Sequence, residues 1–263
     1  MSVRHPAVAG MFYPADPDEL RQDLRRAFAD AIPPPGDAPV PKALIVPHAG
    51  YIYSGAVAAS AYLRLIPARD TIKRVVLLGP SHRVHVAGLA APVDNLFDTP
   101  LGMVLVDADL RAAVADLPGV ILDDLPHVHE HSLEVQLPFL QTVLDEFTLL
   151  PLSVGDTTTE QVTAVLESVW GGPETLIVIS TDLSHYHSYD DARRLDARTA
   201  AAIVGGAAGA VADSDACGAR PLRGMLQLAS DREMTIENVD LRNSGDTAGD
   251  RERVVGYGAF VVV

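Results

Sequence analysis

The sequence predicts an α/β fold, in which a mainly parallel central sheet forms the middle layer of a three-layer α/β/α arrangement. Two observations predict it. Continuous apolar runs, such as Ala43–Val46 and Arg74–Gly79, are typical of strands that are buried on both faces. Helical patterns separate these runs, as in successive βαβ units. The length of 263 residues suits one large α/β domain, and we expect residues 1–263 to form it.

The first helix is predicted to begin directly after Asp16. An aspartate caps the N-terminus of a helix well, and Pro17 suits the first helical position. Apolar residues between Leu20 and Ala31 then recur at helical spacing. The proline-rich segment 33–36 should end this helix, and it is too short to mark a domain boundary.

The same two patterns predict the remaining elements in order. Strands are expected at Ala43–Val46, Arg74–Gly79, Ala87–Ala91, Met103–Val106, Thr148–Leu152, Thr175–Ile179, Met234–Leu241 and Val254–Val263. Helices are expected over residues 55–65, 109–117, 132–147 and 221–229, after a capping box formed by Thr157 and Glu160, and after Ser188 and Asp191. Pro138 marks either the true start of the 132–147 helix or a kink within it.

Composition excludes several classes of protein. Twenty basic and 35 acidic residues give a formal charge of −15, which argues against a nucleic-acid or anionic-membrane binder. The single cysteine excludes internal disulfides and cysteine-rich zinc or iron–sulfur sites. No apolar run is long enough to span a membrane, and we expect a soluble cytoplasmic protein. A bound metal would have to be held mainly by histidines and carboxylates.

Histidines follow three of the predicted strands. His48 comes after the strand at 43–46, His82 after the strand at 74–79, and Asp182 and His185 after the strand at 175–179. In an open α/β sheet, ligands bind beyond the carboxyl ends of the strands. We therefore expect these side chains to share one pocket.

A second polar cluster lies between His127 and Glu134. His131 and Glu134 are three residues apart, and Glu130 and Glu134 are four apart, so each pair could share a helical face. These residues either line a second side of the pocket or cap and solvate the helix that follows. Tyr51 is expected to form part of the pocket wall.

Three kinds of chemistry are open to such a pocket. Two imidazoles and a carboxylate with free coordination positions describe a non-haem Fe(II) site, and zinc hydrolysis needs the same ligand types. A hydrolase using Ser81, His82 and Asp182 is weaker, because the sequence lacks a Gly-x-Ser-x-Gly elbow. Phosphate-binding and dinucleotide-binding glycine motifs are missing too.

Several motifs together resemble those of the Memo family, whose bacterial and archaeal members are called AmmeMemoRadiSam system protein B. They occur in order along nearly the whole chain, and as an ordered set they are specific. The matching segments are Arg4–Pro14, Pro47–Tyr51, Gly79–His82, His131–Pro138 and Asp182–His185.

The resemblance implies a fold similar to class III extradiol dioxygenases, which hold Fe(II) with two histidines and a carboxylate. By motif, His48 and His82 match the two histidine ligands, and His185 matches the acid–base histidine near the substrate. Animal members carry a cysteine near the C-terminus where this chain has Thr247. Our hypothesis is that the adjacent Asp246 restores a carboxylate ligand.

The resemblance also implies a metal-binding, redox-type protein whose divalent metal is Fe(II), with copper or zinc as alternatives. The ligand would be a small molecule or peptide, and the family is associated with radical-SAM and AMMECR1-like proteins. A non-enzymatic peptide- or metal-binding module and a zinc hydrolase remain alternatives. The catalytic candidates are His185, Asp182 and His131, and the substrate-binding candidates are Tyr51, Glu134, Ser81 and Cys217.

Overall fold

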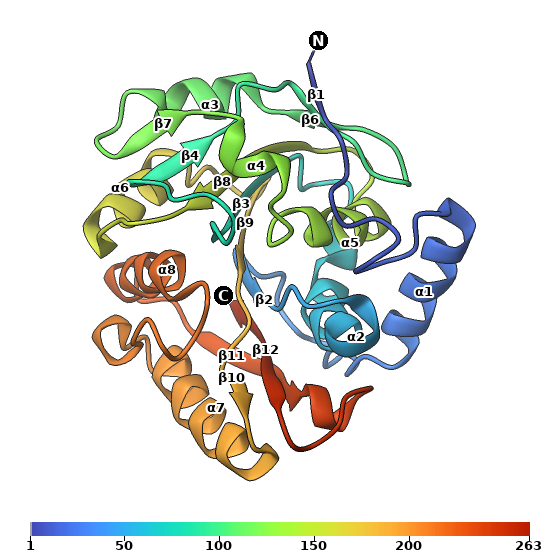
Figure 1. The fold of residues 1–263 in the computed structure, drawn as a ribbon. Helices are drawn as coiled ribbons and strands as arrows, with labels where there is room; N and C mark the ends of the chain where they lie inside the picture. The colour runs from blue at the N-terminus through green and yellow to red at the C-terminus, as the bar shows by residue number, and fades with distance from the viewer. Residues whose placement is uncertain (1) are drawn as a thin grey trace.

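A mainly parallel sheet forms the middle of the computed structural model, which describes residues 2–263 (Figure 1). Strands β6, β8, β3, β9 and β2 are neighbours in that order and are parallel to one another, and antiparallel pairings flank them. The predicted α/β fold class is confirmed. The strands are β1 (Val3–Arg4), β2 (Ala43–Val46), β3 (Arg74–Pro80), β4 (Leu89–Ala91), β5 (Leu96–Phe97), β6 (Val104–Val106), β7 (Val120–Leu122), β8 (Thr148–Val154), β9 (Thr175–Ser180), β10 (His185–His187), β11 (Ile236–Asn243) and β12 (Val254–Val262).

Helices cover both faces of this sheet, as Figure 1 shows. Along β3, Val75 and Leu77 pack into one hydrophobic core with α1, α2 and α5, whereas Val76 and Leu78 pack into another with α6 and α8. This alternation buries both faces of the strand, which explains its continuous apolar sequence. The helices are α1 (Pro17–Ala29), α2 (Tyr51–Tyr62), α3 (Ala108–Ala115), α4 (Leu125–Val128), α5 (Leu137–Val143), α6 (Thr159–Ser168), α7 (Tyr189–Val204) and α8 (Ala219–Asp231).

Two helix starts agree with the capping residues in the sequence. The Asp16 side chain accepts hydrogen bonds from the backbone N–H groups of Asp18 and Glu19, at 2.9 and 3.0 Å, and Pro17 begins α1. The hydroxyl of Ser188 accepts from the backbone of Asp191 at the start of α7. In both cases a side-chain oxygen satisfies N–H groups that have no partner within the helix.

The capping box predicted at Thr157 and Glu160 is wrong by one residue. Thr158 caps α6 by accepting from the backbone N–H of Gln161, and the Gln161 side chain accepts from the backbone N–H of Thr158. Glutamine accepts the reciprocal hydrogen bond as well as glutamate does. The sequence therefore contains two overlapping capping-box patterns, Thr157–Glu160 and Thr158–Gln161, and the structure forms the second.

The long helix predicted over residues 132–147 is also wrong. A 3₁₀ turn over Glu134–Gln136 precedes the short helix α5, and Pro138 lies in its first turn. The missing N–H of proline costs nothing there, because the first N–H groups of a helix have no intrahelical partner. The segment before Glu134 is therefore free to follow an irregular path past the ends of the strands.

Glu134 joins the N-terminal segment to this irregular path. One carboxylate oxygen accepts from the Arg4 guanidinium and from the backbone N–H of Ala7. The other accepts from the backbone N–H of Val8 and from the Tyr13 hydroxyl, at 3.0 and 2.5 Å. Glu134 has no exposed surface, so a buried charge is balanced by one cation and three neutral donors.

The Arg4 guanidinium completes the same connection. Beyond Glu134, it donates to the backbone carbonyls of His127, at 2.9 Å, and Glu130, at 2.7 Å. Its five N–H donors in a rigid fork suit several acceptors at once. Residues 4–13 are thereby fixed against residues 127–134.

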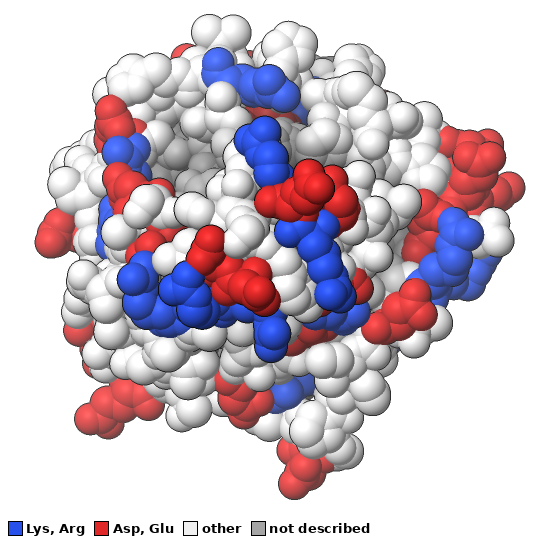
Figure 2. Space-filling model, turned by 60° about the horizontal axis from the view of Figure 1, so that its bottom comes forward, with Lys and Arg blue, Asp and Glu red and all other residues white. Residues whose placement is uncertain are grey.

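The charged groups at the surface are mixed in sign. On the face drawn in Figure 2, basic side chains lie among acidic ones and form no continuous basic surface. Within residues 2–263, no helix combines the length and the apolar character needed to cross a bilayer.

We expect Glu134→Gln to destabilise the fold by about 3–5 kcal/mol, because it leaves the buried Arg4 guanidinium without a counter-charge. Urea unfolding followed by circular dichroism measures this change. Asp18→Asn is the matched control, since it removes an ion pair with Arg21 that lies in solvent. If both variants lost the same small amount of unfolding free energy, Glu134 would not be a stabilising partner of Arg4.

Candidate metal centre

Three neighbouring strands deliver polar side chains to one edge of the sheet. Strand β9 lies between β3 and β2, and all three are parallel, so their carboxyl ends are adjacent. His48, His82 and Asp182 each stand two residues beyond the end of a strand, at β2, β3 and β9 respectively. The position predicted for the pocket is thus the place where these segments meet.

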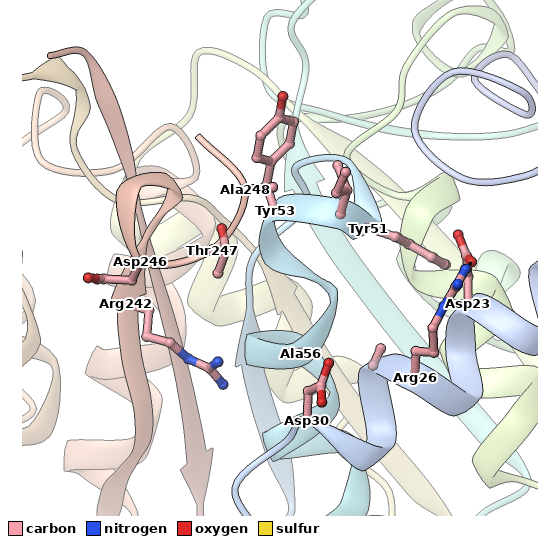
Figure 3. A pocket seen from close by; sticks show the side chains of 12 residues that line it. Asp23, Arg26, Asp30, Tyr51, Tyr53, Ala56, Arg242, Asp246, Thr247 and Ala248 are labelled. Carbon is pink, nitrogen blue, oxygen red and sulfur yellow. Dashed lines mark hydrogen bonds and ion pairs between the residues drawn. The ribbon is translucent and has the colours of Figure 1, made fainter. Parts of the chain in front are cut away.

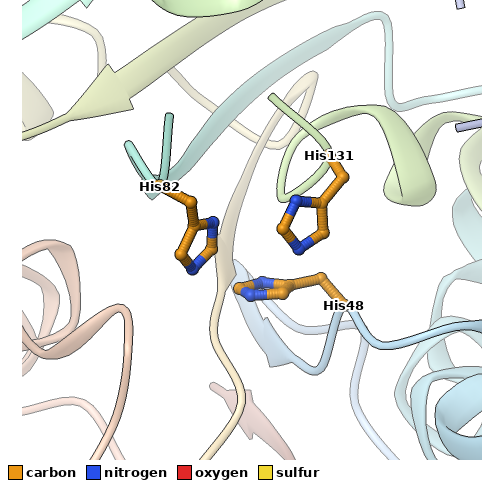
Figure 4. Close-up of side chains that lie close together, drawn as sticks. All are labelled: His48, His82 and His131. Carbon is orange, nitrogen blue, oxygen red and sulfur yellow. The ribbon is translucent and has the colours of Figure 1, made fainter. Parts of the chain in front are cut away.

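His48, His82 and His131 form a compact cluster at this edge (Figure 4). One ring nitrogen from each lies within 4.8 Å of the others, the spacing at which the three could hold one metal ion. The rings of His82 and His131 are stacked with their centroids 4.7 Å apart, and the His48 ring meets both edge-on. His131 comes from the irregular segment before α5 rather than from a strand end.

A hydrogen-bond network fixes the tautomer of His48. Ser180 Oγ donates its one hydrogen to the carbonyl of Ser132, at 2.6 Å, and accepts from the side-chain amide of Gln136, at 2.8 Å. The 2.9 Å contact with His48 Nδ1 must therefore be one in which Nδ1–H donates to Ser180. The lone pair of His48 Nε2 is left free for a metal.

A buried carboxylate does the same for His82. Glu130 Oε1 lies 2.9 Å from His82 Nδ1, and Oε2 accepts from the backbone N–H of His82. Burial alone would raise the pKa of Glu130, but the bonds from His82 and the Ser132 N–H outweigh it and lower that pKa to about 2. The ionised carboxylate accepts from Nδ1–H, so Nε2 of His82 is the free nitrogen.

His131 has a ring nitrogen that no protein group satisfies. Its Nδ1 is buried without a hydrogen-bond partner within residues 2–263; the Glu130 carboxylate lies 3.3 Å away without the geometry of a bond. Burial lowers the pKa of His131 to about 4, and burial with the neighbouring imidazoles holds the pKa of His48 well below its usual range. Neutral imidazoles are the form that binds metals. The donors present therefore fit a divalent ion.

Asp182 and His185 lie beside this cluster. Asp182 accepts from the backbone N–H of His48 at 2.8 Å, and burial raises its pKa to about 7. Burial lowers the pKa of His185, which lies half-exposed at the start of β10, so its imidazole is neutral near pH 7. Asp182 can therefore exchange a proton near neutral pH, and the neutral imidazole of His185 can accept one, as an acid–base function requires.

Cys217 also reaches the cluster, just before α8. Its sulfur lies 3.3 Å from His48 Nε2 and accepts from the backbone N–H of Asp182 at 3.2 Å. Burial raises the pKa of the thiol to about 12. Cys217 and Ser81 line a cavity of about 260 Å³, and the Ser81 hydroxyl donates to the carbonyl of Val84.

The structure does not bring Asp246 to the three histidines. One oxygen of its carboxylate accepts from the Tyr189 hydroxyl at 2.5 Å, and the other from the backbone N–H of Asn243 at 3.0 Å. It lines a different cavity of about 580 Å³ together with Thr247 and Tyr51, and its carboxylate points away from Tyr51 (Figure 3).

Tyr51 and Glu134 face protein rather than open space. The Tyr51 side chain is nearly buried, and its hydroxyl donates to the carbonyl of Val135 at 2.7 Å. Glu134 is fully buried and uses both oxygens to hold the N-terminal segment. The expected contact of Glu134 with a substrate is therefore not supported, since no part of its carboxylate is accessible.

Sequence reasoning missed the residues that orient the histidines. The sequence does not distinguish between a pocket residue and a helix cap for Glu130, and it indicates no role for Ser180 or Gln136. Ser180 is the last residue of β9 and Gln136 belongs to the motif around His131, so the signal available was a polar residue in an apolar stretch. Buried polar residues need partners, which makes such positions candidates for a network.

Comparison with known proteins agrees with these motifs. The family model for Memo-like proteins matches residues 4–261. MEMO1 family proteins of Aquifex aeolicus and Methanopyrus kandleri are 38% and 35% identical, over 98% of this chain and 98% of each relative. The MEMO1 family protein of Methanosarcina acetivorans is 37% identical over the full length of both chains. The chain therefore belongs to the Memo family.

Proposed function

We propose that this chain is a metal-dependent oxidoreductase in which His48, His82 and His131 hold a divalent transition-metal ion, with Fe(II) as the leading choice. The observation that carries the proposal is the arrangement of nitrogens: in two of the three imidazoles, a hydrogen-bonded partner leaves Nε2 free. The third has a buried nitrogen without a partner. Three protein ligands leave coordination positions open for a substrate.

Such an ion, when bound, would supply Lewis-acid and redox chemistry. The protein's own groups would position the substrate and move its protons. His185 is neutral near pH 7 and can accept a proton from a substrate hydroxyl. Asp182, with its raised pKa, can store or return that proton. The ligand of the cleft would be a small molecule or a peptide.

A zinc-dependent hydrolase is the second candidate, and one observation favours it. The three clustered donors are all histidines, the set found in some catalytic zinc sites, whereas the expected carboxylate is directed elsewhere. The same residues would hold the zinc, and His185 and Asp182 would exchange protons with a water that the zinc activates. The identity of the bound metal separates the two candidates.

We expect the protein purified without oxygen to contain close to one equivalent of metal, and His48→Ala and His82→Ala to lose it, because each removes a ligand with a free Nε2. Elemental analysis for iron, copper and zinc measures this. His85→Ala is the matched control, since His85 lies in the same loop as His82 but is exposed. No metal in the unaltered protein would refute the proposal, and zinc alone would favour the hydrolase.

Glu130→Gln should weaken metal binding by about 10–100-fold, because an amide no longer fixes the tautomer of His82 as an ionised carboxylate does. Competition with a chelator measures the affinity. Asp156→Asn provides the comparison, since Asp156 pairs with a histidine, His85, at the surface. An unchanged affinity in Glu130→Gln would show that the buried carboxylate does not tune the site.

His185→Gln should keep its metal but lose activity. If the oxidoreductase proposal holds, oxygen uptake with a panel of catechols should fall by about 10²–10⁴-fold, because the proton acceptor is removed while the ligands remain. Metal analysis of the same sample checks the second half of the expectation. Loss of metal along with activity would instead place His185 among the ligands.

A further inference from the structure

We propose that the Cys217 thiolate is a fourth protein donor to the same centre, which makes it a mixed histidine–cysteine site for a thiophilic transition-metal ion. This inference rests on the proposed metal site and names the donor that sets its metal preference. The structure places the Cys217 sulfur next to His48 Nε2, a buried nitrogen that is freed for a metal.

The distance between sulfur and nitrogen fits a shared ion. Metal–nitrogen and metal–sulfur bonds of about 2.0–2.1 and 2.3 Å separate the two donors by about 3.1 Å at a right angle and about 3.6 Å at a tetrahedral angle. The observed separation of Cys217 Sγ and His48 Nε2 is 3.3 Å, between these limits. An ion on His48 Nε2 can therefore bond the sulfur. The sulfur would move closer to the other two rings as the ion binds, because the donors within 4.8 Å of one another are those of His48, His82 and His131.

Two further observations point to an ion among these groups. His48 is 2% exposed, and within residues 2–263 the sulfur is the only hydrogen-bond partner of its Nε2. His131 Nδ1, in the same cluster, is buried without any partner. A buried ring nitrogen without a partner, such as His131 Nδ1, is rare, and an ion bound in the cluster accounts for it.

Burial keeps the Cys217 thiol protonated in the metal-free protein, and coordination to an ion would remove its proton. The backbone N–H of Asp182 donates to the sulfur at 3.2 Å, and the Thr181 hydroxyl lies 3.8 Å away. N–H donors to a cysteine sulfur stabilise its charged form. As the ion binds, the thiol loses its proton to solvent and the resulting thiolate forms the bond to the metal.

A thiolate donor changes which ions the site prefers. Thiolates favour zinc, iron and copper, whereas magnesium and manganese prefer oxygen ligands. Three imidazoles already favour zinc, iron, copper and nickel, and a thiolate shifts the preference further toward soft ions such as Cu(I) and zinc. The cavity shared by Cys217 and Ser81 leaves room beside the sulfur for a ligand.

Cobalt(II) substitution tests the proposal, because cobalt gives separate signals for binding and for sulfur coordination. The metal-free protein is titrated with Co(II), and visible d–d bands report binding while a near-ultraviolet charge-transfer band reports a thiolate ligand. The chain has one cysteine, so a thiolate band can come only from Cys217. Cys217→Ser is the matched variant, since a hydroxyl still accepts from the Asp182 N–H.

We expect both signals in the unaltered protein, and in Cys217→Ser the loss of the charge-transfer band and a more than tenfold weaker Co(II) affinity. Cobalt bound with no thiolate band in the unaltered protein would overturn the role of Cys217 and leave the histidine site standing. No cobalt binding at all would overturn the metal site itself. If Cys217→Ser fails to fold, X-ray absorption of the unaltered protein decides, by the presence or absence of a sulfur neighbour at about 2.3 Å.

Discussion

The buried carboxylate of Glu130 is the constraint on which the site depends. It accepts hydrogen bonds from the ring and backbone of His82 and from the backbone N–H groups of His131 and Ser132. A single acceptor group thus shapes the loop after β3, shapes the segment before α5, and fixes the tautomer of one histidine. Four donors offset the cost of burying its charge, which is why the carboxylate remains ionised. The positions of His82 and His131 and the tautomer of His82 thus depend on this one group.

Glu134, four residues further on, extends the constraint to the N-terminus. Arg4 bonds both its carboxylate and the carbonyl of Glu130, so the N-terminal segment supports the loop that carries His131. The Phe12 ring from the same segment packs against the His131 ring, with centroids 4.8 Å apart. The N-terminal segment thereby packs against a site whose other residues follow the ends of strands. Groups that hydrogen-bond to metal ligands hold those ligands in one orientation, which raises the affinity of the site for the metal.

The sequence predicted the parts of this site that a strand positions directly. His48, His82, Asp182 and His185 follow β2, β3 and β9, and the rule for parallel sheets predicts from the sequence that they lie at one edge. The role of His131 was not predictable in this way, because it lies on an irregular segment whose path depends on Glu130, Glu134 and Arg4. Short elements such as β1, β7 and β10 were missed as well, since two or three residues show no periodicity. The hypothesis for Asp246 rests on its position next to Thr247, the residue that matches the cysteine of animal members. Adjacent residues point in different directions, and the Asp246 side chain bonds Tyr189 and Asn243.

A divalent ion at this site would need a negatively charged ligand, and Cys217 rather than Asp246 is placed to supply it. Three neutral imidazoles leave the full charge of a divalent ion uncompensated by its ligands, and a buried charge is costly without an opposite charge nearby. Glu130 and Asp182 are close, but their oxygens bond the far side of a ring and the backbone rather than the free nitrogens. The Asp246 carboxylate accepts hydrogen bonds from the Tyr189 hydroxyl and the backbone N–H of Asn243 instead. Cys217 is then the ionisable group at bonding distance from a free nitrogen, and its thiolate would lower the net charge of the centre by one unit, as a carboxylate ligand does in sites of two histidines and one carboxylate.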